Sequence, residues 1–383
     1  MRKSIYILTF SLFFLLGGTP ESMFAQNKLK YNGQVSAWAG LNPGSELPAL
    51  GGIRYLPKLS YGIGRKDTSY FDFELSANAF ANSQFQPFDS FLNSSSIRPY
   101  RAWIRYSTAQ WEVRAGLQKI NFGSASILRP MMWFDQIDPR DPLQLTNGVY
   151  GVLGRYYFVN NANIWLWGLY GNEARKGWEQ TLTVKKQPEF GGRVQYPVPR
   201  GELALTYHHR TAQSLNLPFD SLREAQIPEN RIGIDGKWDV GVGLWFEASY
   251  ISKQKFVGSL THQGLFNVGI DYTFGLGNGL SVMAEQLTFA YDENAFAFEN
   301  PSTLTAATVT YPLGFYDNLT GVLYYDWAGQ NLFTFVNYSH QFKLISLNVI
   351  GYWNPNNTQI IQQDEGANTF SGRGFQVMLV YNH

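Results

Sequence analysis

The sequence predicts an all-β fold, a single-chain transmembrane antiparallel β-barrel of about 18 strands, with about 16 as the alternative. First, apolar and polar residues alternate with a period of two through most of the chain, as in strands with one apolar and one polar face. Second, the connections between these segments alternate between short and long, which is typical of barrels that cross a membrane. Third, 16% of the residues are aromatic and only 15% are charged. No window after the N-terminal segment contains the roughly 18 consecutive apolar residues that a spanning helix needs.

Residues 1–25 are predicted to be a secretory signal peptide. Arg2 and Lys3 precede an apolar run from Ile5 to Leu16, and small residues follow it, which is the order found in signal sequences. An uncleaved anchor is the alternative, but the apolar run is nearer to about 12 than to about 20 residues. We therefore expect signal-directed export to the outer membrane of a bacterial cell, and one barrel domain over residues 26–383.

The alternating segments after residue 25 are the predicted strands. In chain order they lie at 31–41, 50–64, 69–80, 97–107, 109–123, 149–158, 161–170, 188–198, 200–210, 228–238, 241–252, 262–273, 277–288, 302–312, 318–327, 330–340, 342–354 and 373–383. An even number of antiparallel strands puts both ends of the chain on the same rim of a closed barrel.

The connections are expected to be short turns on one rim and long loops on the other, as in barrels with periplasmic turns and extracellular loops. Short turns are predicted at Thr108–Ala109, 159–161, Pro199–Arg200, Val240, 275–277 and Gln341. Long loops, rich in Asn, Pro, Gly and Asp, are predicted at 81–96, 124–148, 171–187, 211–227, 289–301 and 355–372. A soluble β-sandwich has no reason to keep long loops on every second connection.

The hairpin at 97–123 indicates which face meets lipid. If Thr108–Ala109 is the turn, Tyr106 lies opposite Trp111 on the outside and Arg105 opposite Glu112 on the inside. Aromatic rings such as these suit the boundary between headgroups and hydrocarbon. We therefore expect an apolar outer face and an inner face that is polar throughout.

Charged side chains on the polar strand positions are the predicted pore lining. The basic ones are Arg54, Lys58, Arg101, Arg105, Arg114, Arg155, Arg193, Arg210, Arg231 and Lys237, and the acidic ones are Asp72, Glu74, Glu112, Glu202, Asp235, Glu247, Asp271 and Glu285. The two signs are nearly balanced, so strong ion selectivity is not expected.

The sequence contains few residues or motifs that indicate catalysis or metal binding. It has no cysteine, which removes disulfides and thiolate sites. His208 and His209 are neighbours on a predicted strand and point to opposite faces, so they cannot share a metal. A net charge of +1 gives no attraction for nucleic acid. We predict no catalytic residues, no metal, no cofactor and no enzymatic activity.

Residues 116–148 carry the most informative motifs. The stretch Gly116 to Gly123 reads GLQKINFG, and Asp138 to Pro142 reads DPRDP. They resemble motifs of Gram-negative, Bacteroidetes-type outer-membrane barrels of the porin-like and alginate-export-like group. In that pattern Leu117 replaces an arginine and Phe122 a tryptophan, so the resemblance implies a porin-like barrel without implying alginate specificity.

The loop at 124–148 combines apolar and charged residues, and a fully solvated loop would not need the apolar ones. It is expected either to enter the lumen as a constriction or to cap the extracellular mouth. The residues that would act in a constriction are Arg129, Trp133, Asp135, Asp138, Arg140 and Asp141, since fixed charges tune passage through channels.

Two functions compete. The first is a porin-like channel for passive diffusion of small hydrophilic solutes, embedded in outer-membrane lipids and possible as a homo-oligomer. The alternative is a barrel that serves as the scaffold or exit port of an envelope assembly or secretion complex. An outer-membrane hydrolase would need a Ser/His or Asp/His constellation at the rim, and no such motif is found in the sequence.

Overall fold

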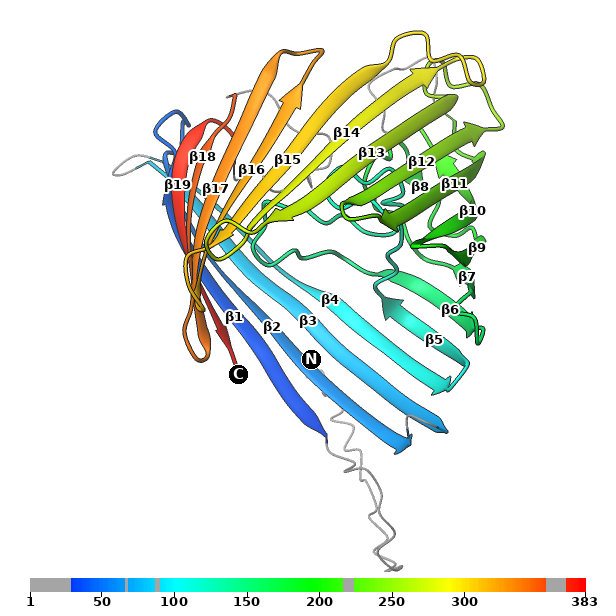
Figure 1. The fold of residues 1–383 in the computed structure, drawn as a ribbon, viewed down its shortest axis with the longest axis horizontal. Helices are drawn as coiled ribbons and strands as arrows, with labels where there is room; N and C mark the ends of the chain where they lie inside the picture. Colours follow the sequence, from blue (N-terminus) through cyan, green and yellow to red (C-terminus); the bar gives the residue numbers. More distant parts are fainter. Residues whose placement is uncertain (1–28, 66–67, 87–89, 216–223, 356–369) are drawn as a thin grey trace, which may run out of the picture.

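The computed structural model describes residues 29–65, 68–86, 90–215, 224–355 and 370–383 (Figure 1). The predicted signal peptide at residues 1–25 lies outside the described residues. Within these ranges, no helix has the length and apolar character needed to cross a membrane.

The described residues form one antiparallel sheet in which 18 strands build the wall of a barrel. The wall strands are β1 (Lys30–Leu41), β2 (Ala49–Arg65), β3 (Ser69–Phe85), β4 (Phe91–Thr108), β5 (Trp111–Gln118), β6 (Val149–Tyr157), β7 (Asn163–Leu169), β9 (Glu189–Val198), β10 (Gly201–Gln213), β11 (Ile227–Asp239), β12 (Gly243–Lys253), β13 (His262–Phe274), β14 (Leu280–Asp292), β15 (Ser302–Pro312), β16 (Asp317–Asp326), β17 (Asn331–Gln341), β18 (Ile345–Trp353) and β19 (Arg373–Asn382). The additional β8 (Leu182–Thr183) pairs only with β10.

The sheet closes on itself between its first and last strands. Leu41 of β1 lies opposite Ala49 of β2 on one side and opposite Phe375 of β19 on the other, and Figure 1 shows β1 beside β19. Closure supplies hydrogen-bond partners to backbone groups that would otherwise be unsatisfied in lipid. The predicted fold class is confirmed, and the 16-stranded alternative is wrong.

The largest differences from the predicted boundaries are in β3, β4 and β5. Most of the connection predicted at 81–96 is strand, because β3 continues to Phe85 and β4 begins at Phe91. Small and polar residues occupy both faces there, so the alternation disappears. The strand predicted at 109–123 ends at Gln118. Gly116 has a φ of 118°, and a Cβ there would lie 2.1 Å from the carbonyl oxygen of Ala102. Only glycine suits this bend, after which the chain leaves the wall.

The two faces of the wall follow the predicted alternation. On β4 and β5 the side chains of Ile104, Tyr106, Trp111 and Val113 are exposed on the outside, whereas Glu112 is buried inside. Tyr150 and Tyr156 lie on the outer face near the two ends of β6 and are exposed. Aromatic residues at both ends of a span are typical of a barrel that meets two membrane interfaces.

The register of the β4–β5 hairpin differs from the prediction by two residues. Tyr106 pairs with Val113 and Arg105 with Arg114, so the predicted direct pairings are wrong. The turn lies one residue later than predicted, at 109–110, because the strands end at Thr108 and begin at Trp111. The faces are unchanged, since a shift of two preserves them. Tyr106 and Trp111 still contact each other, with ring centroids 5.3 Å apart.

Connections of opposite length lie on opposite rims. The rim of short turns, here the turn rim, includes 109–110 between β4 and β5 and 199–200 between β9 and β10. The other rim, here the loop rim, includes 119–148 between β5 and β6 and the connection from β18 to β19. Antiparallel pairing around the barrel puts these last two connections on the same rim, as predicted. It also places the start of β1 and the end of β19 together on the turn rim, where Gly33 N donates to His383 O at 3.0 Å.

Replacing an outward-facing residue by arginine tests the membrane face. We expect Val113→Arg or Ile232→Arg to lower the free energy of unfolding by about 2–4 kcal/mol if the residue is near the bilayer midplane. Both side chains are exposed on the outer surface. Urea titration of the barrel folded into lipid vesicles measures the change.

The matched control is Ser60→Arg, on the inner face of β2 opposite Glu74, which should unfold like the parent. Gln118 also lies on the polar face, but it is unsuitable as a tolerant position. It is fully buried and its side-chain amide donates to the carbonyl oxygens of Arg114 and Gly151. Equal destabilisation by Val113→Arg and Ser60→Arg would contradict the assignment of the faces.

Candidate channel lumen

Residues 119–148, here the inner segment, contact the inner wall of the barrel. Ser124 Oγ donates to Asp235 Oδ2 on β11 at 2.8 Å, and Trp133 Nε1 donates to Ser249 Oγ on β12 at 3.2 Å. These wall residues alternate with exposed apolar ones such as Ile232 and Ile234. The inner segment therefore lies inside the lumen rather than over its mouth, and Figure 1 shows it crossing the interior.

Two buried carboxylates of the wall bind the backbone of the inner segment. Glu285 on β14 accepts hydrogen bonds from the amides of Ser126, Ile127 and Leu128 at 2.6, 3.1 and 2.5 Å. Charge-assisted hydrogen bonds of this kind are stronger than neutral ones. They satisfy amides that have no strand partner, which a buried segment requires.

Glu247 on β12 repeats this arrangement. Its carboxylate accepts from the amides of Ala125 at 2.9 Å and Met131 at 2.6 Å, and the side chain is fully buried. The two glutamates thus hold five amides of the inner segment against strands β12 and β14.

Apolar contacts cover the wall beside these anchors. Ile127, Leu128 and Met132 of the inner segment are buried against inward-facing side chains of β13 to β18. That part of the wall contributes Leu265, Leu287, Phe289, Leu304, Ala306, Val322, Tyr324, Phe333, Phe335, Ile350 and Tyr352. The prediction of an inner face that is polar throughout is therefore wrong. Here the barrel interior is a packed core, and removing it from water is favourable.

A second group of rings holds the start of the inner segment. Phe122 stacks on Trp167 of β7 with centroids 5.6 Å apart, and meets Trp133 and Phe134 edge-on. Phe122 is one of the departures from the resembled motif, and it fits this aromatic cluster by shape. Edge-to-face and offset contacts of this kind add to the area that the rings bury.

The charged residues predicted to act in a constriction are mostly paired within the inner segment. Arg129 is buried, forms an ion pair with Asp135 at 2.7 Å and donates to Phe122 O at 3.1 Å. Burial opposes the guanidinium charge, but the neighbouring Asp135 and Glu247 carboxylates outweigh it and raise the pKa of Arg129. Arg129 therefore fixes the segment's conformation and does not face open lumen.

The part of the inner segment from Asp138 to Leu145, here its tip, is also held by ion pairs and hydrogen bonds. Arg140 is buried and pairs with Asp138 at 2.7 Å, and its guanidinium lies over the ring of Tyr324 at 5.9 Å. Asp141 accepts from the amides of Leu143 and Leu145, while burial raises the pKa of its carboxyl group. The DPRDP motif therefore builds a compact turn.

A second segment, residues 170–188 between β7 and β9, also packs inside the barrel. Trp178 is buried, and its Nε1 donates to Arg129 O at 2.9 Å. Glu179 forms ion pairs with Arg210 on β10 at 3.0 Å and Arg231 on β11 at 2.6 Å. This segment therefore packs against the inner segment and connects it to the wall through ion pairs.

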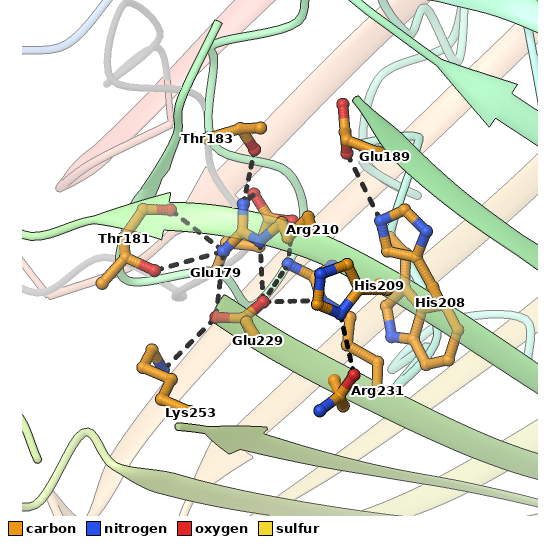
Figure 2. A network of polar contacts seen from close by, with 12 residues as sticks. Glu179, Thr181, Thr183, Glu189, His208, His209, Arg210, Glu229, Arg231 and Lys253 are labelled. Carbon is orange, nitrogen blue, oxygen red and sulfur yellow. Dashed lines mark hydrogen bonds and ion pairs between the residues drawn. The ribbon is translucent and has the colours of Figure 1, made fainter. Parts of the chain in front are cut away.

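Figure 2 shows the charged network around Arg210. Glu229 on β11 pairs with Arg210 and Arg231 at 2.7 Å each, and with Lys253 at 3.5 Å. Thr181 and Thr183 accept further bonds from the Arg210 guanidinium. Because all these charges are buried, removing one partner would leave another uncompensated, a loss of about 3–5 kcal/mol.

Sequence reasoning missed this second segment. Residues 171–187 were expected to be an external loop, and Glu179 and Trp178 were not singled out. The available signal was a tryptophan in a stretch otherwise rich in polar residues, the same kind of mixture that marked the loop at 124–148.

The wall of β3 to β6 keeps a charged surface that solvent reaches. Arg105, Arg114 and Arg155 converge on Glu112, at 3.4, 3.6 and 3.1 Å, and their side chains are 15–26% exposed. Asp72 forms a two-pronged bond with Arg105. Three guanidinium groups thus share two carboxylates, leaving one excess positive charge.

Aromatic rings hold these arginines in place. Arg105 and Arg114 both lie over Trp103, at 5.5 and 4.8 Å, and Arg155 lies over Trp165 at 3.8 Å. Cation–π contacts of this kind stabilise a guanidinium without neutralising it.

Other predicted lining residues also lie on the inner face, and each makes its own kind of contact. Arg54 lies over Trp38 at 5.5 Å, while Arg101 is buried and donates to Thr146 O of the inner segment at 3.0 Å. Arg193 is buried and pairs with Asp235 at 2.6 Å. Lys58 and Glu74 are half-buried on β2 and β3, and Glu202 accepts a hydrogen bond from Gln195.

The adjacent histidines lie on opposite faces, as predicted. His208 is fully buried and accepts from Trp167 Nε1 at 3.2 Å, with Glu189 at 3.3 Å from its other nitrogen. His209 contacts Phe190 on the outside. Within the described ranges, no cluster of three or more His, Asp or Glu is arranged to hold a metal ion.

A cavity of about 530 Å³ opens beside the tip of the inner segment, near the turn rim. Pro142 and Leu143 of the tip line it, together with Gln34, Asn348 and Val380 of the wall. The inner segment therefore leaves water-accessible space beneath it.

The fold is similar to those of solved outer-membrane porin-like barrels. OccAB1 of Acinetobacter baumannii matches with a TM-score of 0.55 and 10% identity, over 92% of this chain and 96% of that one. OccK5 of Pseudomonas aeruginosa matches at 0.54 and 11%, over 93% and 97%. OmpF of Salmonella typhi, in complex with daunomycin, matches at 0.51 and 10%, over 94% and 100%. No protein-family model and no curated protein matches this sequence. At these identities the likeness shows a porin-like barrel fold.

Neutralising one anchor tests how the inner segment is held. In Glu285→Gln the side chain keeps one accepting oxygen, and its NH2 group faces either the amide of Ser126 or the amides of Ile127 and Leu128. We expect the inner segment to detach locally, with a loss of at least about 2–3 kcal/mol. Hydrogen exchange at Ser126, Ile127 and Leu128 in the folded barrel should speed up accordingly.

Glu202→Gln is the matched control, since Glu202 makes one side-chain bond to Gln195 and touches no part of the inner segment. Its exchange pattern should equal that of the parent protein. Unchanged protection of the three amides in Glu285→Gln would show that apolar packing alone holds the segment.

Proposed function

We propose that this chain is an outer-membrane channel for passive diffusion of small hydrophilic solutes. The observation that carries the proposal is the division of the barrel interior. Inner segments fill the side of β10 to β18, while the wall of β3 to β6 keeps partly exposed arginines held by Trp103 and Trp165. Such a wall supplies fixed charge beside a narrowed passage, which is how channels select among solutes.

Charge is distributed unevenly around this interior. The carboxylates of Asp235, Glu247 and Glu285 accept hydrogen bonds from the inner segment. The side chains of Arg114 and Arg155, in contrast, keep part of their surface in solvent. We infer a modest preference for anionic solutes along the arginine wall. The nearly equal numbers of basic and acidic residues predicted to line the interior do not predict such a preference.

Location and lineage belong to the same proposal. The exposed apolar face fits outer-membrane lipids, and residues 1–25 would direct export. The GLQKINFG and DPRDP motifs support a relation to Bacteroidetes-type, alginate-export-like barrels, and assembly as a homo-oligomer is compatible with the fold. No catalytic role is proposed.

The second candidate is a scaffold or exit port of an envelope complex. The extent of the packing inside the lumen favours it, because a barrel filled by its own segments need not conduct. Planar-bilayer recording of the purified protein separates the two. Steady open-state current supports the channel, and a silent barrel supports the scaffold.

Removing a partly exposed guanidinium tests the anion preference. We expect Arg114→Gln to shift the permeability ratio toward cations by about twofold, because one fixed positive charge leaves a region of reduced dielectric. Reversal potentials in a salt gradient measure this ratio. Arg129→Gln is the comparison, and it should leave the ratio unchanged if the channel stays folded, since Arg129 does not face solvent. An equal shift in both variants would contradict the assigned positions.

Shortening the inner segment between Ser124 and Thr146 tests whether it narrows the channel. We expect higher single-channel conductance and a shift toward cations, because Glu247 and Glu285 would then face the lumen. Shortening the external connection 293–301 is the control and should alter neither property. A shortened barrel with normal folding and unchanged conductance would refute the constriction.

A further inference from the structure

One strand of the wall has a free edge near the loop rim. β4 pairs with β3 along its length, but β5 pairs with it only from Ala102 to Ser107. Among the described residues, no strand pairs with the other side of Phe91 to Arg101. A free edge in an otherwise closed barrel exposes unpaired backbone groups.

The direction of these groups follows from the hairpin. Gln86 N donates to Ser90 O at 2.8 Å, which makes that pair a hydrogen-bonded one. Antiparallel pairs alternate, so Leu92, Ser94 and Ser96 bond to β3. Phe91, Asn93, Ser95 and Ile97 therefore turn their N–H and C=O groups to the free edge.

Proline ends this row of donors. Pro99 occupies the next edge-facing position, and its nitrogen carries no hydrogen. A bulge follows, where the register of β3 and β4 shifts between Ser76 and Ala77. The free edge is thus a straight strand of about seven residues, close to the usual length of a strand.

The segment is open on its faces as well as its edge. Phe91 is 74%, Leu92 60% and Ile97 80% exposed. From Phe91 to Ile97 there is no charged residue, although proteins commonly protect free edges with lysine, inward charges or bulges. An edge without such protection, flanked by uncovered apolar side chains, is suited to strand addition.

We propose that the free edge of β4 is a docking site for an extended segment of a partner polypeptide, which adds as a strand beside Phe91–Ile97. Only an extended backbone offers donors and acceptors at the two-residue repeat of this edge. Side chains of the added strand cover Phe91 and Ile97, and a carboxylate near its end meets Arg98. The inference is independent of conductance and holds for either a channel or a scaffold.

Hydrogen exchange at single-residue resolution tests the proposal on the full barrel in detergent. In the protein alone, the amides of Phe91, Asn93, Ser95 and Ile97 should exchange at least about 100-fold faster than those of Leu92, Ser94 and Ser96. The probe is a synthetic peptide of about ten residues with alternating threonine and valine and one aspartate. At saturation it should slow the four edge amides about tenfold or more.

The matched variants are Ser95→Pro and Ser95→Ala. Proline removes a donor from the free edge without touching the β3 ladder, and should weaken peptide binding about tenfold. Alanine keeps the donor and should bind as the parent does. If Ser95→Pro loses the folded band on a heat-modifiability gel, Asn93→Lys with Ser95→Lys replaces it, since edge lysines oppose strand addition.

Four outcomes would overturn the proposal. Slow exchange of the edge amides in the protein alone would show that the chain's own residues cover the edge. Protection that rises with protein concentration would indicate a second copy as the occupant. Fast exchange that the peptide does not slow, or equal binding by the proline and alanine variants, would exclude strand addition.

Discussion

The binding of the inner segment's amides by Glu247 and Glu285 is the interaction on which the interior depends. A segment that leaves the sheet loses its backbone partners, and burying it without substitutes is costly. Five amides find those substitutes on two wall carboxylates. Once the backbone is satisfied, Ile127, Leu128 and Met132 can pack against the apolar wall. The buried carboxylates are in turn stabilised by these bonds and by Trp245, which donates to Glu285.

This anchoring divides the barrel interior into two sides that differ in packing and solvent exposure. On one side, charged residues such as Glu229 and Arg210 and apolar side chains of the wall bind the inner segments. On the other side, Arg114 and Arg155 remain partly in solvent beside their tryptophans. In the proposed channel, this wall of fixed guanidinium groups would face the packed inner segments and give the passage a defined charge.

The route taken by the chain after Gln118 has a structural consequence for the wall itself. Because the chain turns inward there, β5 is short and does not pair with the part of β4 near the loop rim. The same bend at Gly116 that admits the inner segment therefore leaves Phe91 to Ile97 with a free edge. The proposed channel narrowing and the proposed docking edge therefore both follow from one change in the direction of the chain.

The sequence by itself determined the strands, their number, the rims and the faces, because a wall between water and lipid imposes a two-residue period on every strand. Ile232 and Arg231 could be assigned to opposite faces for that reason alone. It could not determine the partners of inward side chains, since contacts across the lumen join residues far apart in sequence, as Leu128 meets Asn267. Thus Arg129 was predicted to act in a constriction and Glu285 to line the pore, and only the tertiary structure showed Arg129 paired with Asp135 and Glu285 bound to backbone amides. The apolar inner wall escaped prediction for a related reason. Leucine and phenylalanine on the inner face break the expected alternation, and their burial depends on a segment that arrives from another part of the chain.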